Sequence, residues 1–412
     1  MLKKIHVKQL TLGMHIDGFC GPWMEHPFWR NHFVITDPKD IQRVLDGSIL
    51  ELWIDTSKGL DLAPGETSLV QTESVEAMVQ ELQNAKAPAC DTQPTTTAAE
   101  YKRAAQICAK SKPALIAMFQ EARMGKTVDA EMATQLVQEI SDSVERNAGA
   151  IISLARLKDA DNYTYMHSVA VCAMMVALSR QLKLDEDQTR AMGLAGLLHD
   201  LGKALMPMDV LNKPGKLTDA EFNVIKSHPS KGHKLLAESQ AVDALVLDVV
   251  LHHHEKTDGS GYPERLKGDA ISLFAKMGAV CDVYDAITSN RPYKNGWDPA
   301  ESLKKMAEWT NGHLDPKVFQ AFVKCLGIYP TGSLVRLSSG RVGVVMEQSP
   351  SSLLKPVVKV FFSTKSDMRI PPEVLDLSGP GCKEKITGRE DPKFWRFKDL
   401  DELWSGMAPL SA

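Results

Sequence analysis

Apolar side chains recur at helical spacing through the middle of the chain. Between about residues 143 and 326 the apolar positions advance in steps of three and four, as on the inner face of an amphipathic helix. Glycine and proline separate several of these segments. The pattern predicts an all-α domain with helices over Tyr163–Leu182, Asp185–Leu201, Asp219–His228, Ser230–Ser239, Ala241–His252, Ser272–Ser289, Glu301–Thr310 and Pro316–Leu326.

The two ends of the chain have strand-like patterns instead. β-Branched and aromatic runs predict strands over Phe33–Thr36 and Leu52–Asp55, and Asp37 followed by Pro38 predicts a helix start between them. After Gly327, further runs of this kind predict a β-rich module. Its expected strands are Leu334–Leu337, Arg341–Met346 and Pro356–Phe362.

The patterns together predict a mainly α protein. A polar stretch over Ala87–Thr97, rich in proline and threonine, is typical of a flexible connector, and helices are expected after it over Glu100–Arg123 and Val128–Arg146. The predicted parts are a small α/β N-terminal domain over 1–66, the connector and its helices over 67–142, the all-α domain over 143–328 and a small β-rich C-terminal module over 329–412.

Composition narrows the class of protein. The chain has 412 residues, of which 43% are hydrophobic and 24% charged, as in an ordinary soluble globular protein. Its net charge is −4 and no long basic run occurs, so a nucleic-acid polymer is not the expected partner. Seven scattered cysteines without a CxxC pair, no signal-peptide run and no apolar stretch of about 20 residues predict a cytoplasmic protein without a membrane span.

Histidines gather in the all-α domain. Seven of the twelve lie between His167 and His254, at the ends or on the inner faces of predicted helices. The apolar run before His199 and Asp200 is expected to end as a helix at Leu201–Gly202, and His228 is expected to close another. Each histidine alone would more often be a structural residue. Together with buried aspartates they predict a metal centre in a helical bundle.

The ligand types leave the metal open. Nitrogen and carboxylate ligands without cysteine suit iron, manganese or zinc. Six or more candidate ligands are too many for one ion, so two ions bridged by a carboxylate are expected. Pairs of metal ions commonly serve the hydrolysis of phosphate esters.

Five separate motifs resemble the HD-GYP family, a branch of the HD phosphohydrolases, over about residues 160 to 326. They are His199–Lys203, Ser227–Pro229, His253–Glu255, Asp258–Pro263 and Asp282–Ser289 followed by Arg291–Lys294. The resemblance identifies the all-α domain as an HD-type helical metal-binding domain. Near the N-terminus, Leu12–Met14, Trp23, His26–Phe28 and Trp53–Asp55 are similar to an uncharacterised regulatory domain often joined to this family.

The resemblance implies hydrolysis of the bacterial second messenger cyclic di-GMP to linear pGpG, GMP or both by a metal-activated water. Asp200 matches the bridging carboxylate, and Lys203 matches a catalytic group that also holds substrate phosphate. The other matching substrate-binding residues are Gly261, Tyr262, Pro263, Arg291 and Lys294. Two divalent ions, with iron or manganese expected, would be held by His167, His199, Asp200, His228, His253, His254 and Asp282.

One position departs from part of the family. Some members have a glutamate four residues before the first ligand histidine, where it helps to hold a third metal, and this chain has Tyr163 there. A neutral phenol is a poor ligand at pH 7, which favours two metals. Another cyclic dinucleotide such as cyclic GMP-AMP, or a non-catalytic nucleotide-binding adaptor, are the alternatives. Protein partners through the N-terminal domain and homo-oligomer formation stay open.

Overall fold

The computed structural model describes residues 2–20, 33–45, 51–62, 97–126, 130–156, 163–213, 215–239, 242–289, 296–310, 312–349 and 351–406. These residues fall into two compact units. One comprises residues 1–80 with 307–313, and the other residues 81–306 with 314–412.

The first unit contains a four-stranded antiparallel sheet in the order β1-β4-β2-β3. Asp37 begins the helix as expected, because its carboxylate accepts a hydrogen bond from the Lys39 amide at 2.8 Å and Pro38 takes the first turn. The buried core includes Ile5, Ile16 and Ile54. Its elements are β1 (Leu2–His6), a 3₁₀ helix (Val7–Gln9), β2 (His15–Cys20), β3 (Phe33–Val34), α1 (Pro38–Leu45) and β4 (Glu51–Asp55).

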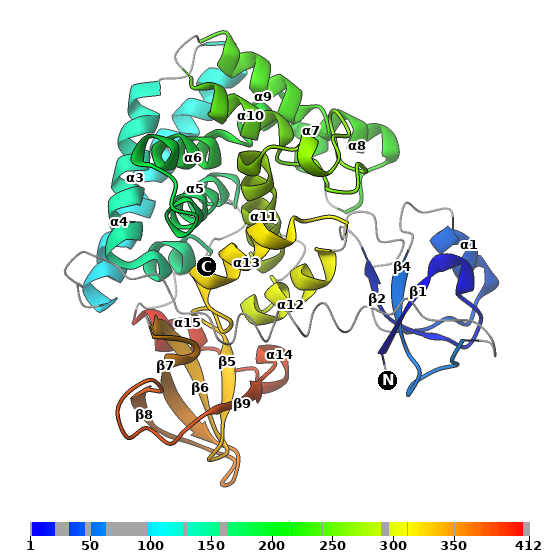
Figure 1. The fold of residues 1–412 in the computed structure, drawn as a ribbon, viewed down its shortest axis with the longest axis vertical. Helices are drawn as coiled ribbons and strands as arrows, with labels where there is room; N and C mark the ends of the chain where they lie inside the picture. Colours follow the sequence, from blue (N-terminus) through cyan, green and yellow to red (C-terminus); the bar gives the residue numbers. More distant parts are fainter. Residues whose placement is uncertain are drawn as a thin grey trace. The chain divides into compact units, whose positions relative to one another are not determined.

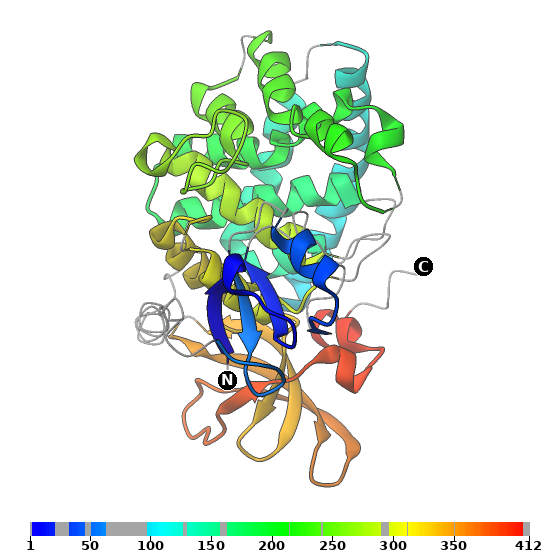
Figure 2. The same cartoon turned by 90° about the vertical axis from the view of Figure 1, so that its right-hand side faces the viewer.

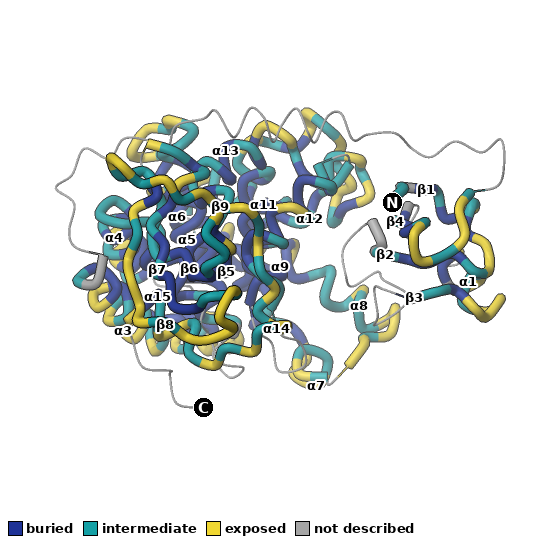
Figure 3. The backbone as a smooth tube through the Cα atoms, turned by 90° about the horizontal axis from the view of Figure 1, so that it is seen from below, coloured by how far each residue is buried: buried dark blue, intermediate teal, exposed yellow. Residues whose placement is uncertain are grey.

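Helices dominate the rest of the chain (Figure 1). Helix α5 lies at their centre, packs against α4, α6, α11 and α13, and is buried along most of its length (Figure 3). The helices are α3 (Thr97–Arg123), α4 (Ala130–Arg156), α5 (Tyr163–Gln181), α6 (Glu186–Leu198), the 3₁₀ helix η4 (Leu201–Leu205), α7 (Met208–Leu211), α8 (Asp219–Ile225), α9 (His228–Ala237), α10 (Ala244–His252), η5 (Gly268–Ala270), α11 (Leu273–Thr288), α12 (Pro299–Trp309) and α13 (Pro316–Leu326).

Two predicted helix ends are wrong. Helix α6 ends at Leu198, and Gly202 lies inside the 3₁₀ turn that follows, so this glycine does not terminate a helix. His228 begins α9 rather than closing the helix before it. The reason is Pro229, which lies in the first turn of α9, where its missing amide hydrogen costs nothing.

A five-stranded antiparallel sheet in the order β8-β7-β6-β5-β9 forms the C-terminal part, coloured from orange to red in Figure 2. Helix α15 packs on β6, and its buried Trp404 lies against Tyr101 of α3 with ring centroids 5.5 Å apart. These contacts join the sheet to the helices. The elements are β5 (Leu334–Leu337), β6 (Arg341–Ser349), β7 (Ser352–Ser363), β8 (Met368–Asp376), β9 (Ile386–Arg389), α14 (Pro392–Trp395) and α15 (Leu400–Ser405).

The structure confirms the predicted fold class, a mainly α protein with a small α/β part at one end and a β-rich part at the other. The predicted boundary at residues 142 and 143 falls inside α4, which has a non-helical residue, Asn147, at a kink. Among the described residues, no helix has the combination of length and apolar character needed to cross a membrane.

Candidate metal centre

The structure brings all seven predicted ligands together. One group contains Asp200, His228, His253 and His254, and a second contains His167, His199 and Asp282. Within each group, one ligand atom per residue lies within 4.8 Å of all the others. The residues lie on or next to five helices. They come from α5, the end of α6, the start of α9, the end of α10 and the middle of α11.

Glycine contacts hold these helices close enough for the ligands to meet. A Cβ atom on Gly202 would lie 1.9 Å from the carbonyl oxygen of His228, and one on Gly232 would lie 3.1 Å from the amide nitrogen of Gly202. The 3₁₀ turn after Asp200 can therefore lie directly on α9. Gly196 makes a similar approach to the Cys172 backbone, which brings α6 against α5.

Backbone carbonyls fix the ring tautomers of three histidines. Nδ1 lies 2.8 Å from the Gly196 oxygen in His199, 2.8 Å from the Ile225 oxygen in His228 and 3.0 Å from the Val250 oxygen in His253. A carbonyl oxygen can only accept, so Nδ1 carries the hydrogen and Nε2 presents a lone pair. His167 is oriented in the same way by Asp285, whose Oδ2 lies 2.7 Å from Nδ1.

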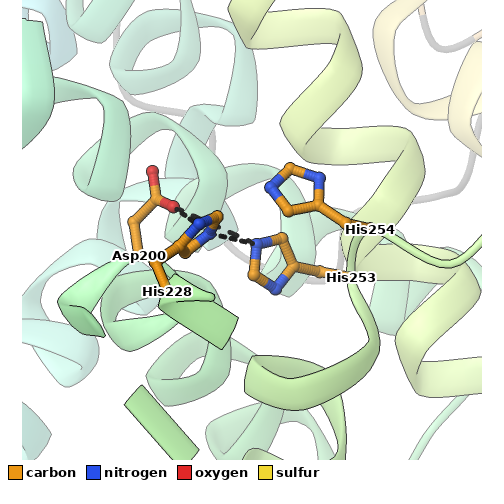
Figure 4. Close-up of side chains that lie close together, drawn as sticks. All are labelled: Asp200, His228, His253 and His254. Carbon is orange, nitrogen blue, oxygen red and sulfur yellow. Dashed lines mark hydrogen bonds and ion pairs between the residues drawn. The ribbon is translucent and has the colours of Figure 1, made fainter. Parts of the chain in front are cut away.

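The Nε2 atoms held in this way point at one another. His167 Nε2 lies 3.1 Å from His199 Nε2, and His228 Nε2 lies 3.3 Å from His253 Nε2 (Figure 4 shows the second pair). Two lone pairs at this distance repel each other unless a cation or a proton lies between them. The histidines of each group are therefore arranged to share a cation.

Asp200 faces both groups. Its Oδ1 lies 3.1 Å from His228 Nε2, while its Oδ2 lies 3.4 Å from Nε2 of both His167 and His199. Oδ1 is buried and has no hydrogen-bond partner among the residues that the structure describes. Each carboxylate oxygen is thus directed at a different set of imidazoles, as a bridging ligand requires.

Asp282 completes the second group and approaches the first. Its Oδ1 lies 3.1 Å from His167 Nε2, and its Oδ2 lies 3.6 Å from His254 Nδ1. Lys203 contacts the centre through Asp200, with 2.5 Å between Nζ and Oδ2. Its ammonium neutralises part of the negative charge of the Asp200 carboxylate.

Burial and nearby charges favour, for most of these side chains, the protonation state that can bind a metal ion. Burial lowers the pKa of His228, lowers that of His253 well below its usual value and lowers that of His254 to about 3. Burial raises the pKa of Asp200, but Lys203 and the imidazoles outweigh it and hold this pKa well below its usual value. Neutral imidazoles beside ionised carboxylates are the form that binds metal.

His167 is the exception. Burial lowers its pKa, but hydrogen bonds with Asp200, Asp282 and Asp285 outweigh the burial and raise it to about 10. Three carboxylates therefore attract a positive charge to this imidazole, in the form of a proton or a metal ion.

Tyr262 lies at the edge of the centre. Its ring centroid is 4.7 Å from that of His254, and its amide donates to the His254 carbonyl oxygen at 3.2 Å. A Cβ atom on Gly261 would lie 2.4 Å from the Lys256 amide nitrogen, so only glycine allows the loop to fold back this closely. Pro263 follows Tyr262 in the same loop.

No role was predicted for Glu255, which the structure places against the residues that follow this loop. The side chain is buried, and its two oxygens accept hydrogen bonds from the amides of Glu264 at 2.7 Å and Leu266 at 3.1 Å. Its position after the two ligand histidines was the available signal. Arg291 and Lys294 lie outside the described residues, as does the side chain of Tyr163.

Comparisons with known proteins agree with this geometry. The model of the HD domain family matches residues 137–318, and that of a domain of unknown function, DUF3391, matches residues 2–133. HD domain proteins are metal-dependent, and the His and Asp groups described above could hold metal ions.

Several relatives have a named activity. A cyclic di-GMP phosphodiesterase of Pseudomonas aeruginosa is 52% identical over 99% of this chain and 97% of its own length. A cyclic di-GMP phosphodiesterase response regulator of Xanthomonas campestris is 36% identical over 51% of this chain and 56% of its own length. A 3′3′-cGAMP-specific phosphodiesterase of Vibrio cholerae is 34% identical over 44% of this chain and 42% of its own length. The full-length match, the HD domain and the ligand geometry show that this chain belongs to the HD-GYP family of cyclic di-GMP phosphodiesterases.

Proposed function

We propose that this chain hydrolyses cyclic di-GMP with two divalent metal ions held by seven His and Asp side chains. The observation that carries the proposal is the position of Asp200 between two groups of imidazoles, with a different oxygen directed at each group. The activity of the full-length relative supports the choice of substrate. The products are linear pGpG, GMP or both.

The two groups give the ligands of the two ions. His228, His253 and His254 would hold one ion, His167, His199 and Asp282 the other, and Asp200 would bridge them. Metal ions in such a site lower the pKa of a bound water and draw charge from a phosphate oxygen.

Nitrogen and carboxylate ligands suit iron or manganese, and no cysteine lies in either group. The chain has tyrosine at position 163, and a neutral phenol is a poor ligand for a third cation. We therefore propose two ions.

Three chain features would act on the substrate. Lys203 would hold a phosphate oxygen near the bridging position, which lies within reach because its Nζ is already 2.5 Å from Asp200. Tyr262 would stack on a base or bond to it, held in place by the Gly261 turn and by Pro263. Arg291 and Lys294 are proposed as further phosphate contacts on the basis of the family motif.

Cyclic GMP-AMP is the alternative substrate, because relatives specific for it share part of this chain. Initial rates on cyclic di-GMP and cyclic GMP-AMP at equal concentrations separate the two activities. A faster rate on cyclic GMP-AMP would reverse the assignment. Binding without turnover would show an adaptor instead. Protein partners, homo-oligomer formation and a cytoplasmic location remain predictions from the sequence.

Replacement of Asp200 by alanine tests the metal centre. Asp200→Ala removes the bridging ligand, so it should abolish turnover and lower bound metal in anaerobically purified protein. His233→Ala, on the same α9 helix as His228, is the matched control and should keep both properties. Full turnover by metal-loaded Asp200→Ala would contradict the proposed mechanism, and three protein-bound ions in the wild type would contradict the number two.

A further inference from the structure

A cavity lies in the larger unit, and none of the seven predicted metal ligands lines it. It has a volume of about 360 Å³, which is in the range of small-molecule sites. Its walls come from the second half of α4, from α5, α11 and α13, and from strands β6 and β7 of the C-terminal sheet. Elements distant in the sequence therefore line one space.

The walls combine an apolar surface with positive charge. Ile152, Met174, Ala177 and Leu353 supply apolar surface. Four cationic side chains also line the cavity, against the acidic Glu145, Glu347 and Asp285. These cations are Arg146, Arg156, Arg180 and Lys324.

The four cationic side chains differ in whether they already form an ion pair or a hydrogen bond. Arg146 is paired with Glu100 at 2.8 Å, and Arg180 lies 3.6 Å from Glu145. Arg156 donates to the Thr331 carbonyl oxygen at 3.3 Å. The side chain of Lys324 has no hydrogen bond or ion pair with the part of the chain that the structure describes, so its charge is available to an occupant.

A break in α4 adds backbone donors. Asn147 has φ −165° and ψ 96°, which interrupts the helix, and its side-chain oxygen accepts from the Ala150 amide at 3.2 Å. The helix therefore starts again after Asn147 and runs to Arg156. Ala148 and Gly149, in its new first turn, line the cavity. Amides in a first turn have no partner within the helix and favour a negative ligand.

We infer that this cavity binds a small phosphorylated heterocycle of mononucleotide size. The phosphate would face Lys324 and the restarted end of α4, and the ring would contact the apolar walls. This site is separate from the one proposed for hydrolysis, because the two sets of lining residues differ.

The cavity is connected to the metal centre through one residue. Asp285 lines the cavity, and its Oδ2 lies 2.7 Å from His167 Nδ1. An occupant that moves Asp285 changes the orientation of a metal ligand. The cavity is thus a regulatory site, whose occupation alters turnover at the centre without competing for its ligands.

Titration calorimetry on the full-length protein tests the inference, with GMP, guanosine and inorganic phosphate as probes. GMP should bind more tightly than guanosine or phosphate, because only GMP offers both the charge for Lys324 and a ring for the apolar walls. Lys324→Glu should weaken GMP binding by at least tenfold and leave basal turnover of cyclic di-GMP unchanged. Lys317→Glu makes the same charge reversal on an exposed face of α13 outside the cavity, so it should bind GMP like the wild type.

A second variant tests whether the loss of GMP binding in Lys324→Glu is only an indirect effect of the changed charge. Ala177→Phe fills the cavity from α5 and should also remove GMP binding, with circular dichroism and metal content checking that the fold is kept. GMP binding that is equal in the wild type, Lys324→Glu and Ala177→Phe would place the nucleotide at the metal centre and overturn the inference. Absence of binding by all three probes would overturn it as well. Turnover of cyclic di-GMP is measured separately, so its absence would count against the proposed function alone.

Discussion

At the scale of one residue, Asp285 orients the predicted ligand His167 without belonging to either group of predicted ligands. It is buried, and it accepts the Nδ1 hydrogen of His167, so it sets both the tautomer and the ring direction of that ligand. Partners of this kind raise the basicity of the imidazole and hold its free nitrogen toward the metal.

Asp285→Asn should lower metal affinity or turnover by roughly 10–100-fold, because the amide is a weaker acceptor and offers no negative charge. Competition with a metal chelator measures the affinity. Asp269→Asn, an exposed residue just before α11, is the control and should behave as the wild type. Equal metal affinity and turnover in Asp285→Asn and the wild type would remove Asp285 from the centre.

Position 202 has no room for a side chain, so it requires glycine. A methyl group at this position would overlap the His228 carbonyl oxygen at 1.9 Å, so Gly202→Ala must push the 3₁₀ turn away from α9. We expect loss of bound metal and a fall of several degrees in the melting temperature, both measured on purified protein. Gly388→Ala meets no atom within 4 Å and serves as the control. Normal metal content in Gly202→Ala would show that the contact can relax.

At this scale the sequence predicted which His and Asp residues lie together, but not the packing that brings them together. His199 and Asp200 are marked by an apolar helix that ends in polar residues, and such a pattern is visible in one dimension. The contact between Gly202 and Gly232 depends on the packing of two segments, so nothing local distinguishes it from a helix-ending glycine.

At the scale of elements, a buried ion pair joins α3 to α4. The Glu100 carboxylate is fully buried and accepts from Arg146 at 2.8 Å and from Ser143 at 2.8 Å. Burial raises the pKa of Glu100, but the hydrogen bonds from Arg146 and Ser143 outweigh it, so the pKa is below its usual value of 4.5.

Glu100→Gln should therefore destabilise the protein in a pH-dependent way. A lowered folded-state pKa stabilises the wild type above the unfolded pKa, and the stabilisation is lost as the pH falls through the folded value. The difference in unfolding free energy should be about 2 kcal/mol at pH 7 and should shrink below pH 4.5. Urea denaturation over a pH series measures it, and Glu139→Gln, in a half-exposed pair with Lys110, should show little effect. A difference that stays constant down to acid pH would contradict this account of Glu100.

Helices were easier to predict than strands, for a physical reason. In a helix of eleven residues such as α13, apolar residues of the buried face recur three or four times along the sequence. The predicted bounds of α13 are those observed. Strand β8 contains Pro371 and Pro372, which argue against a strand, yet β8 lies at the edge of its sheet, where missing amide donors are tolerated. Strands β1 and β2 were missed because they are short and polar residues interrupt them.

At the scale of the whole molecule, the helical part begins well before the ligands. Helix α3 packs on α4 and α5, and Arg123 at its end donates to the Ala204 carbonyl oxygen in the 3₁₀ turn after Asp200, at 3.0 Å. The turn that carries Lys203 is thus supported from a helix in the predicted connector region.

A protein shortened to residues 97–412 should therefore keep its metal, whereas one shortened to 143–412 should lose stability and metal. The second deletion cuts α4 and removes α3, which exposes the apolar surface that both helices bury. Metal analysis and thermal melting of the two proteins compare them. Equal metal content and melting temperature would show that α3 is dispensable for the centre.

The ligands are spread from His167 to Asp282, and this spread has a consequence during synthesis. A ribosome releases His167 and His199 long before Asp282, so the group that these three residues form cannot close until α11 has left the exit tunnel. Partial sets of imidazoles are exposed in the meantime and could take up whichever cation is most available. A metal bound by the second group would therefore depend on the supply of ions when α11 docks, as well as on the preference of the finished site.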